Sequence, residues 1–175
     1  MNQNEEREVM SRHEDLRAIQ LFAGFDDAEI DAFVDAADRR SVPEDHVFFG
    51  MGTLNSLLFI VVAGSVKIDR LGSAEDIPLA TLGAGQTFGE MSFMDGSRTT
   101  ATVTAVEPTN VLEITRETVD RLIDEKPNMA AKLWRNFALD LKHRLTKTND
   151  LIDQYIDINQ VLLQDQTFRE YYSRL

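Results

Sequence analysis

The sequence predicts a mainly β fold, a sandwich or jelly-roll barrel with helices before and after it in the chain. Eight of the nine Gly residues and three of the four Pro residues lie between Ser41 and Ile114. They separate short runs rich in β-branched and aromatic side chains, which is typical of antiparallel strands joined by turns. No long helical pattern interrupts this segment, so a doubly wound parallel sheet is disfavoured.

The chain before the β-rich segment is expected to be helical from Asn4 to Arg40. Its first part, Glu5 to Gln20, is expected to form a polar helix with few apolar side chains. Asp26 can cap a second helix, because Glu29 stands three residues later and can complete a capping box. The buried face of that helix is formed by apolar residues at helical spacing: Ile30, Phe33, Val34 and Ala37.

Six strands and a short helix are predicted next. Each strand is a short run bounded by Gly, Pro or polar turn residues. The predicted strands are Val47–Phe49, Leu57–Val62, Ser65–Asp69, Ile77–Leu82, Ala101–Ala105 and Asn110–Ile114. The short helix, Arg116–Glu125, follows the last strand, because Val119, Leu122 and Ile123 share one helical face.

A long helix is predicted from Pro127, since proline suits the first turn of a helix and neither Pro nor Gly follows. Its residues recur at alternating four- and three-residue steps, as in a coiled coil: Phe137, Leu141, Arg144, Thr148, Leu151, Tyr155, Ile158 and Leu162. The helix can dock on its own barrel, but one small barrel can hardly cover so long a seam. We therefore expect a homodimer through this helix. A basic first half and an acidic second half suit antiparallel pairing, and a bend near Thr146–Asn149 is the alternative.

Composition excludes several classes of function. The chain carries 18 basic and 30 acidic residues, and its net charge of −12 disfavours broad contact with DNA or a membrane surface. It has no Cys, and its three His residues lie far apart, so neither a metal site nor a cupin-type enzyme is expected. The longest apolar run, Leu57 to Ala63, is about a third of a membrane helix. With no apolar targeting segment at the N-terminus, a cytoplasmic protein is expected.

The segment from Gly85 to Val103, here called the cassette, carries the chemistry of a candidate ligand site. It comprises a Gly-bearing turn, one short helical turn, a loop and a returning strand. The N–H groups at a helix start favour an anion, and Glu90 can accept a hydrogen bond from a sugar hydroxyl. Arg98 and nearby Thr hydroxyls stand at the far end of the loop. These residue types indicate a pocket for a phosphate and a ribose.

The cassette resembles the phosphate-binding cassette of the cyclic-nucleotide-binding domain family. That family includes the regulatory domains of cyclic-nucleotide-dependent kinases and the sensor domains of catabolite-activator-type regulators. The resemblance extends upstream through Leu58–Ile68, Gly52 and Val47–Phe49 to Leu21–Phe25, and in all covers about Leu16 to Leu145. It implies an eight-stranded jelly roll whose long C-terminal helix covers the pocket, and a cyclic nucleotide as ligand.

The same resemblance exposes a departure at the expected phosphate site. In the family, the cassette Glu bonds the ribose 2′-OH, and an Arg nearer the strand pairs with the cyclic phosphate. Glu90 matches that Glu, but in a gap-free alignment Thr99 fills the Arg position and Arg98 stands one place early. Because one residue reverses the side-chain direction in an extended segment, Arg98 would point away. Losing such a charge-assisted bond costs on the order of 1.5–3 kcal/mol, so we expect binding nearer micromolar than nanomolar.

The predicted ligand contacts come from the cassette and from the C-terminal helix, a residue of which commonly caps the purine in this family. The expected ligand-binding residues are Phe88, Gly89, Glu90, Met91, Ser92, Arg98, Thr99, Thr100, Ala101 and Trp134. The predicted protein is a non-catalytic regulator that binds cAMP or cGMP and signals through its C-terminal helix to an unidentified protein partner. Two alternatives remain open: a degenerate domain without nucleotide that serves as a dimerising docking module, and a cyclic dinucleotide receptor.

Three segments are expected along the chain: a helical extension over 1–20, the jelly roll with its C-terminal helix over 21–145, and a helical extension over 146–175. No helix-turn-helix is expected beyond Leu145, because the remaining segment is short, acidic and without a Gly turn. Direct DNA binding of that kind is therefore not predicted.

Overall fold

The computed structural model describes residues 16–72 and 76–164. The chain divides into two compact units, Met1–Phe137 and Ala138–Leu175. The division into three segments that the sequence predicts stays a prediction. The elements in chain order are η1 (Gln20–Phe22), α2 (Asp27–Ala36), β1 (Asp38–Val42), β2 (Val47–Phe49), β3 (Leu57–Ala63), β4 (Val66–Arg70), β5 (Ile77–Leu82), β6 (Thr87–Phe88), α3 (Glu90–Asp95), β7 (Thr102–Ala105), β8 (Thr109–Thr115), α4 (Arg116–Glu125) and α5 (Pro127–Gln164).

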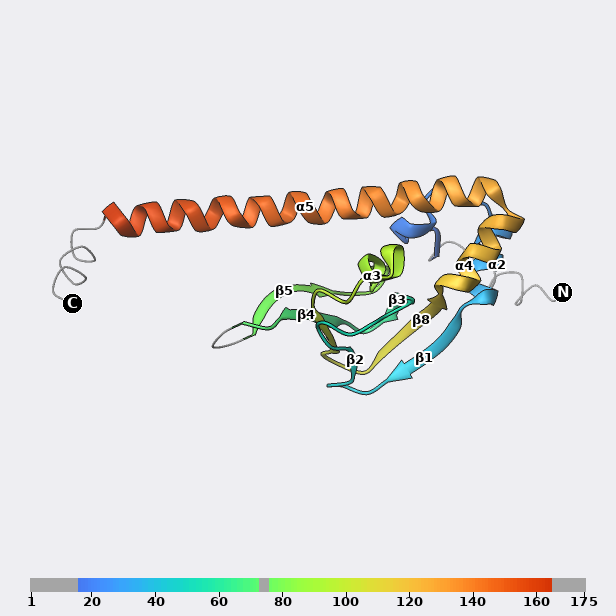
Figure 1. The fold of residues 1–175 in the computed structure, drawn as a ribbon, viewed down its shortest axis with the longest axis horizontal. Helices are drawn as coiled ribbons and strands as arrows, with labels where there is room; N and C mark the ends of the chain where they lie inside the picture. The colour runs from blue at the N-terminus through green and yellow to red at the C-terminus, as the bar shows by residue number, and fades with distance from the viewer. Residues whose placement is uncertain (1–15, 73–75, 165–175) are drawn as a thin grey trace. The chain divides into compact units, whose positions relative to one another are not determined.

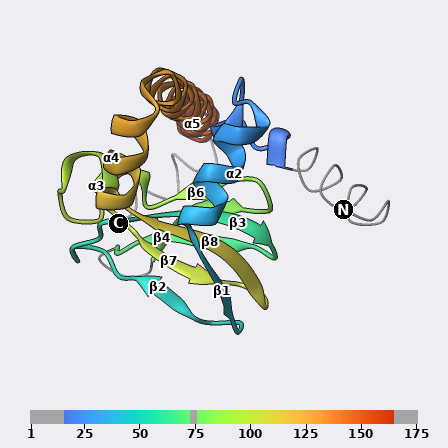
Figure 2. The same cartoon turned by 90° about the vertical axis from the view of Figure 1, so that its right-hand side faces the viewer.

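The strands form two four-stranded sheets, with the orders β1-β8-β3-β6 and β2-β7-β4-β5 (Figure 1 and Figure 2). All of the recorded strand pairs are antiparallel, for example β3 with β8, where Ile60 faces Leu112, and β4 with β7, where Ile68 faces Val103. Figure 2 shows the sheets with α2 and α4 on one side of them. The predicted eight-stranded, jelly-roll-like fold with flanking helices is confirmed.

Strand β3 is apolar throughout, and from Leu58 to Val61 both of its faces are buried. Phe59 and Val61 belong to the cluster between the sheets, together with Val66, Phe88 and Val103. The alternate residues of β3 join a second cluster under the helices, whose buried members are Ile19, Leu21, Phe22, Phe25, Ile30, Phe33, Val34, Leu58, Ile60, Phe93, Leu112, Ile114, Val119, Leu122, Met129, Leu133 and Phe137. Side chains that alternate across a strand can serve two cores at once.

The start of α2 follows the sequence prediction. The Asp26 side chain accepts a hydrogen bond from the Glu29 N–H at 2.8 Å, and the Glu29 carboxylate accepts one from the Asp26 N–H at 2.8 Å. This reciprocal arrangement is the predicted capping box. The expected helix from Glu5 lies, as far as residue 15, outside the described residues.

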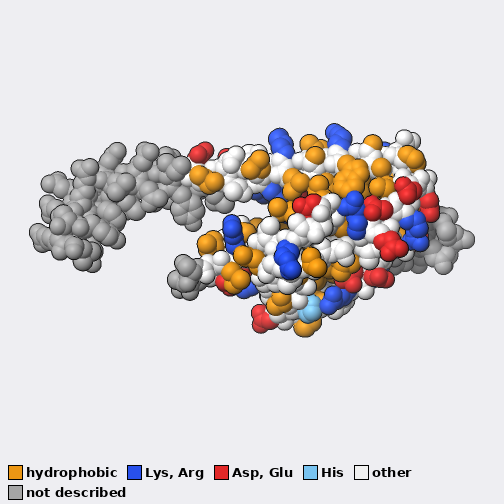
Figure 3. Space-filling view, viewed as in Figure 1, with side chains coloured by type: hydrophobic (Ala, Val, Ile, Leu, Met, Phe, Trp, Pro, Cys, Tyr) orange, Lys and Arg blue, Asp and Glu red, His pale blue; other side chains and the backbone are white. Residues whose placement is uncertain are grey.

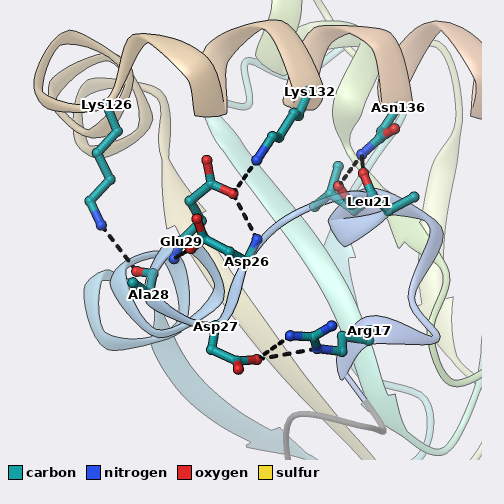
Figure 4. A network of polar contacts seen from close by, with 10 residues as sticks. Arg17, Leu21, Asp26, Asp27, Ala28, Glu29, Lys126, Lys132 and Asn136 are labelled. Carbon is teal, nitrogen blue, oxygen red and sulfur yellow. Dashed lines mark hydrogen bonds and ion pairs between the residues drawn. The ribbon is translucent and has the colours of Figure 1, made fainter.

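Polar contacts fix the first turns of α5 to α2 and η1 (Figure 4). The Lys132 ammonium lies 2.6 Å from the carboxylate of Glu29, whose side chain is 8% exposed. The Asn136 amide donates to the Leu21 carbonyl oxygen at 2.8 Å and to the Ala23 carbonyl oxygen at 2.9 Å. These contacts, here called the α5 latch, make the start of α5 part of the first unit.

Two strands lie where the sequence pattern did not predict strands. β1 occupies Asp38–Val42, at the end of the segment expected to be helical. Its first four residues are exposed, and the strand exists because it pairs with β8, where Arg40 faces Val111. β6 is only Thr87–Phe88, paired with Phe59 and Ile60 of β3. By contrast, α4 has the predicted bounds and α5 begins at the predicted Pro127.

Acidic side chains gather over the α4 end of the first unit (Figure 3). Glu117, Asp124 and Glu125 are exposed on α4, and Asp120 is half-buried. Over the described ranges, 16–72 and 76–164, no helix is both long enough and apolar enough to span a membrane.

Candidate functional site

The cassette folds as the sequence predicts, with a short helix between two glycines in the left-handed region. Gly89 has φ of 80° and precedes α3, and Gly96 has φ of 71° and ends it. A Cβ on Gly89 would lie 2.8 Å from the Leu57 carbonyl oxygen and 3.0 Å from the Asn55 amide nitrogen. Both the conformation and the close approach of β3 therefore require glycine at position 89.

Glu90 and Ser92 are buried at the start of α3, 4% and 3% exposed. The Ser92 hydroxyl donates to the Gly89 carbonyl oxygen at 3.3 Å and accepts from the Asn55 amide at 3.2 Å. Asn55 also donates to the Leu57 carbonyl oxygen at 2.7 Å. Asn55 is thus a supporting residue of the cassette that sequence reasoning missed, because nothing in its local pattern marks a contact with a helix 34 or more residues later.

Thr99 is buried, 6% exposed, and its hydroxyl is bonded to the loop between β2 and β3. The hydroxyl donates to the Gly50 carbonyl oxygen at 2.7 Å and accepts from the Thr53 N–H at 3.0 Å. The Thr53 hydroxyl lies 3.3 Å away. Two backbone bonds reinforce this contact, from Gly52 N–H to the Thr99 carbonyl oxygen at 2.8 Å and from Thr99 N–H to the Thr53 carbonyl oxygen at 2.9 Å.

Arg98 faces the opposite way from Thr99. It is exposed, and its guanidinium donates to the Gly52 carbonyl oxygen at 2.7 Å. Its backbone forms an isolated bridge with that of Leu54, so the segment is extended at this point. Alternation in an extended segment therefore puts Thr99 inside and the cation outside, as the gap-free alignment anticipated.

The other predicted cassette residues divide between the core and the surface. Phe88 is 1% exposed and stacks on Phe59, with ring centroids 4.7 Å apart, and Ala101 is also buried. Met91 and Thr100 are exposed, and the Thr100 hydroxyl lies 3.8 Å from the Met91 sulfur. Phe88 and Ala101 therefore shape the site through packing, whereas Met91 and Thr100 lie at its surface.

Trp134 lies on α5 and is half-buried. Its ring centroid is 5.7 Å from that of Phe137 and 5.6 Å from the guanidinium carbon of Arg116. Arg116 is a second residue that the sequence did not single out. It opens the predicted helix α4, and no local signal shows that its side chain reaches α3, more than 20 residues earlier.

One carboxylate of the cassette has a shifted pKa. The Asp95 carboxylate accepts a hydrogen bond from the Ser97 N–H at 2.8 Å. Hydrogen bonds from the Ser97 side chain and backbone hold the pKa of Asp95 below its ordinary value of 3.8. In the part of the chain that the structure describes, no group of three or more His, Asp or Glu could hold a metal ion.

The jelly-roll-like fold of two antiparallel sheets thus carries a short, glycine-flanked helix with a buried carboxylate, Glu90. The family model described as "Cyclic nucleotide-binding domain" matches residues 39–126. The chain therefore belongs to the cyclic nucleotide-binding domain family and contains a sensor domain of that family.

Relatives of known identity agree with this assignment. The cyclic AMP receptor protein of Thermus thermophilus is 36% identical over 126 residues, which are 69% of this chain and 58% of the relative. The crystal structure of the Thermus thermophilus catabolite activator protein has a TM-score of 0.68 at 32% identity, and the match covers 78% of this chain and 62% of that one. The chain thus spans less than two thirds of either protein.

A third relative is an enzyme, Glutaminase 2 of Bradyrhizobium diazoefficiens. It is 32% identical over 133 residues, which are 76% of this chain but 21% of the relative. The domain of this family is typically non-catalytic, and segments similar to it also occur within longer chains that are enzymes.

Proposed function

We propose that this chain is a non-catalytic sensor that binds cAMP or cGMP with micromolar affinity. The observation that carries the proposal is the start of α3, where the left-handed Gly89 brings the helix against β3 and Glu90 is buried. The first N–H groups of a helix lack intrahelical acceptors and favour an anion. In the proposed complex these N–H groups face the cyclic phosphate, and Glu90 accepts a hydrogen bond from the ribose 2′-OH.

The proposed affinity is low because the phosphate would meet hydroxyl groups and no buried cation from this loop. Thr99 is the inward residue, and its hydroxyl is already bonded to Gly50 and Thr53. Arg98 is exposed, where water weakens its attraction for an anion. Removing a charge-assisted bond leaves an affinity nearer micromolar, roughly −8 kcal/mol.

Isothermal calorimetry with cAMP and cGMP tests this proposal. Wild-type protein should bind one of them with a micromolar dissociation constant. Glu90→Gln keeps the shape of the side chain but removes the carboxylate, and it should weaken binding about tenfold or more. Glu117→Gln, on the exposed face of α4, is the control and should bind as wild type does. Binding that is equal in all three proteins would exclude the cassette as the site.

A docking module without nucleotide is the second candidate. The bonds between Thr99 and the β2–β3 loop favour it, because they complete the cassette with the protein's own groups. In that case neither nucleotide gives heat or thermal stabilisation. A cyclic dinucleotide, the third possibility, is distinguished by including it in the same titration.

We further propose that the signal leaves through α5 and that α5 pairs with a second copy. Leu145 and Ile152 are seven residues apart on this helix and are 62% and 50% exposed, which is the spacing of one heptad. Phe137, the first residue of the predicted seam, is not available for pairing, because it is 1% exposed and packs in the core of its own unit. From Leu151 onwards, the seam side chains lie outside those that the structure describes. The protein partner, the absence of DNA contact and a cytoplasmic location remain predictions from the sequence.

A further inference from the structure

We propose that Arg116 is the positioning residue that joins the cassette helix α3 to α4 and α5. It lies outside the predicted ligand contacts, at the first position of α4. Its side chain contacts one residue on its own helix, two carbonyl groups on α3 and an aromatic ring on α5. A change in the position of α3 would therefore be passed to α5 through this guanidinium, beside the direct contact of the Phe93 and Phe137 rings, whose centroids are 6.2 Å apart.

The carbonyl groups at the end of α3 show why this position needs a cation. The Ser92 carbonyl oxygen accepts from the Gly96 N–H at 2.8 Å. The next two carbonyl oxygens, of Phe93 and Met94, accept from one Arg116 nitrogen at 3.0 and 2.8 Å. The last carbonyls of a helix have no intrahelical donors and carry its partial negative charge. The Arg116 guanidinium gives these two carbonyl oxygens a hydrogen-bond donor and places a positive charge at the end of α3.

Two aromatic rings and a carboxylate fix the direction of the guanidinium. Its carbon lies 5.7 Å from the centroid of the Phe93 ring on α3 and 5.6 Å from that of the Trp134 ring on α5. The Arg116 Nε donates to the Asp120 carboxylate at 2.9 Å, one turn along α4. A planar guanidinium can stack on rings and donate to carbonyls at the same time, which a lysine ammonium cannot do equally well.

The consequence is a physical link between the cassette and the start of α5. The role of this link in signalling rests on the proposed sensor function, because it assumes that a ligand moves α3. The link itself makes no such assumption and can be measured without nucleotide. Trp134 is the only Trp of the chain, so the fluorescence of the protein reports directly on the α5 side of the Arg116 contact.

The first test compares Arg116→Gln with Arg121→Gln, an exposed arginine on the same helix. Arg116→Gln should shift Trp134 emission to longer wavelength, because water replaces the guanidinium on the ring. It should also speed hydrogen exchange at the Phe93 and Gly96 amides about tenfold, since α3 loses its charged partner. Arg121→Gln should change neither. Arg116→Lys should not restore the emission, whereas full restoration would mean that any cation there suffices and would overturn the proposal.

A double-mutant cycle then measures how far a change at the end of α3 alters the surroundings of Trp134 on α5. Gly96→Ala strains the end of α3, because residue 96 has a positive φ, while a Cβ there meets no atom within 4 Å. In the wild-type background this change should shift Trp134 emission. In the Arg116→Gln background the shift should be smaller, because only the contact of Phe93 with Phe137 still joins α3 to α5. Equal shifts in both backgrounds would overturn the proposal, whether or not any nucleotide binds.

Discussion

Thr99 and Arg98 are neighbours in the cassette, yet their side chains have opposite surroundings. Thr99 is 6% exposed and hydrogen-bonded to the loop between β2 and β3, whereas Arg98 is exposed and its guanidinium donates to the Gly52 carbonyl oxygen. A hydroxyl can complete this loop without a counter-charge, but an inward arginine would need one. At the scale of single residues, the Thr99 end of the cassette is therefore held to the β2–β3 loop by neutral hydrogen bonds.

Replacing Thr99 by Val should destabilise the fold. Valine keeps the shape but removes the hydrogen bonds of the Thr99 hydroxyl to the Gly50 carbonyl oxygen and from the Thr53 N–H, which leaves these two groups with only the contacts inside the β2–β3 loop. We expect a loss of about 1–2 kcal/mol in urea unfolding. Thr100→Val, at the exposed neighbour, should stay within about 0.5 kcal/mol of wild type. Equal losses in the two variants would contradict the role given to the Thr99 hydroxyl.

Asp95 should make a small, pH-dependent contribution to stability. Its pKa in the folded state lies below 3.8 because of hydrogen bonds from Ser97. A lowered folded-state pKa means that the contribution is present above the ordinary value of 3.8 and is lost as pH falls through the folded value. The free energies of unfolding of wild type and Asp95→Asn should therefore approach each other as pH falls below 3.8. For the control Asp124→Asn, exposed on α4, the difference in unfolding free energy from wild type should not change with pH in this way.

At the scale of elements, the α5 latch explains why a long polar helix begins where it does. Pro127 starts α5, and Met129, Leu133 and Phe137 bury its first turns. Asn136 then holds η1 through the Leu21 and Ala23 carbonyls. Its own amide oxygen is buried without a hydrogen-bond partner among the described residues.

Asn136→Leu should destabilise the protein by about 1–2 kcal/mol. The change leaves two carbonyl groups of η1 and its following loop unpaired, and loss of the unpaired amide oxygen offsets only part of that cost. Asn128→Leu places the same side chain at an exposed position of α5 and should be near neutral. The midpoints of thermal unfolding of the two variants test this prediction. An unchanged midpoint for Asn136→Leu would contradict the stabilising role of the α5 latch.

Elements with a strong local signal could be predicted from the sequence. The capping box of Asp26 and Glu29, the helix Arg116–Glu125 and the start of α5 all follow from short-range patterns. β1 could not be predicted, because its first four residues are exposed and its existence depends on pairing with β8. For the same reason, the contacts of Asn55 and Arg116 with α3 were missed: both join segments far apart in the sequence.

At the scale of the whole molecule, the exposed side chains of α5 lead to a prediction of dimerisation. Leu145→Asp combined with Ile152→Asp should convert a dimer into a monomer in sedimentation velocity, because charges would replace two exposed apolar side chains one heptad apart, next to the predicted seam residues Arg144 and Leu151. Truncation after Leu141 should do the same. Lys147→Asp, at an exposed position on the opposite side of the helix from Leu145, should leave the dimer intact. Wild-type protein that stays monomeric at high micromolar concentration would contradict the prediction.

The central claim is that the cassette binds a cyclic nucleotide weakly, through the start of α3 and without a buried cation from its loop. The most direct measurement is an NMR titration of ¹⁵N-labelled protein with cAMP and cGMP up to about a millimolar, well above the expected micromolar dissociation constant. We expect saturable shifts at the amides of Gly89 to Ser92 and at Arg98 to Ala101, with a micromolar dissociation constant. The absence of saturable shifts in these residues, or stoichiometric binding with nanomolar affinity, would contradict the proposed weak site.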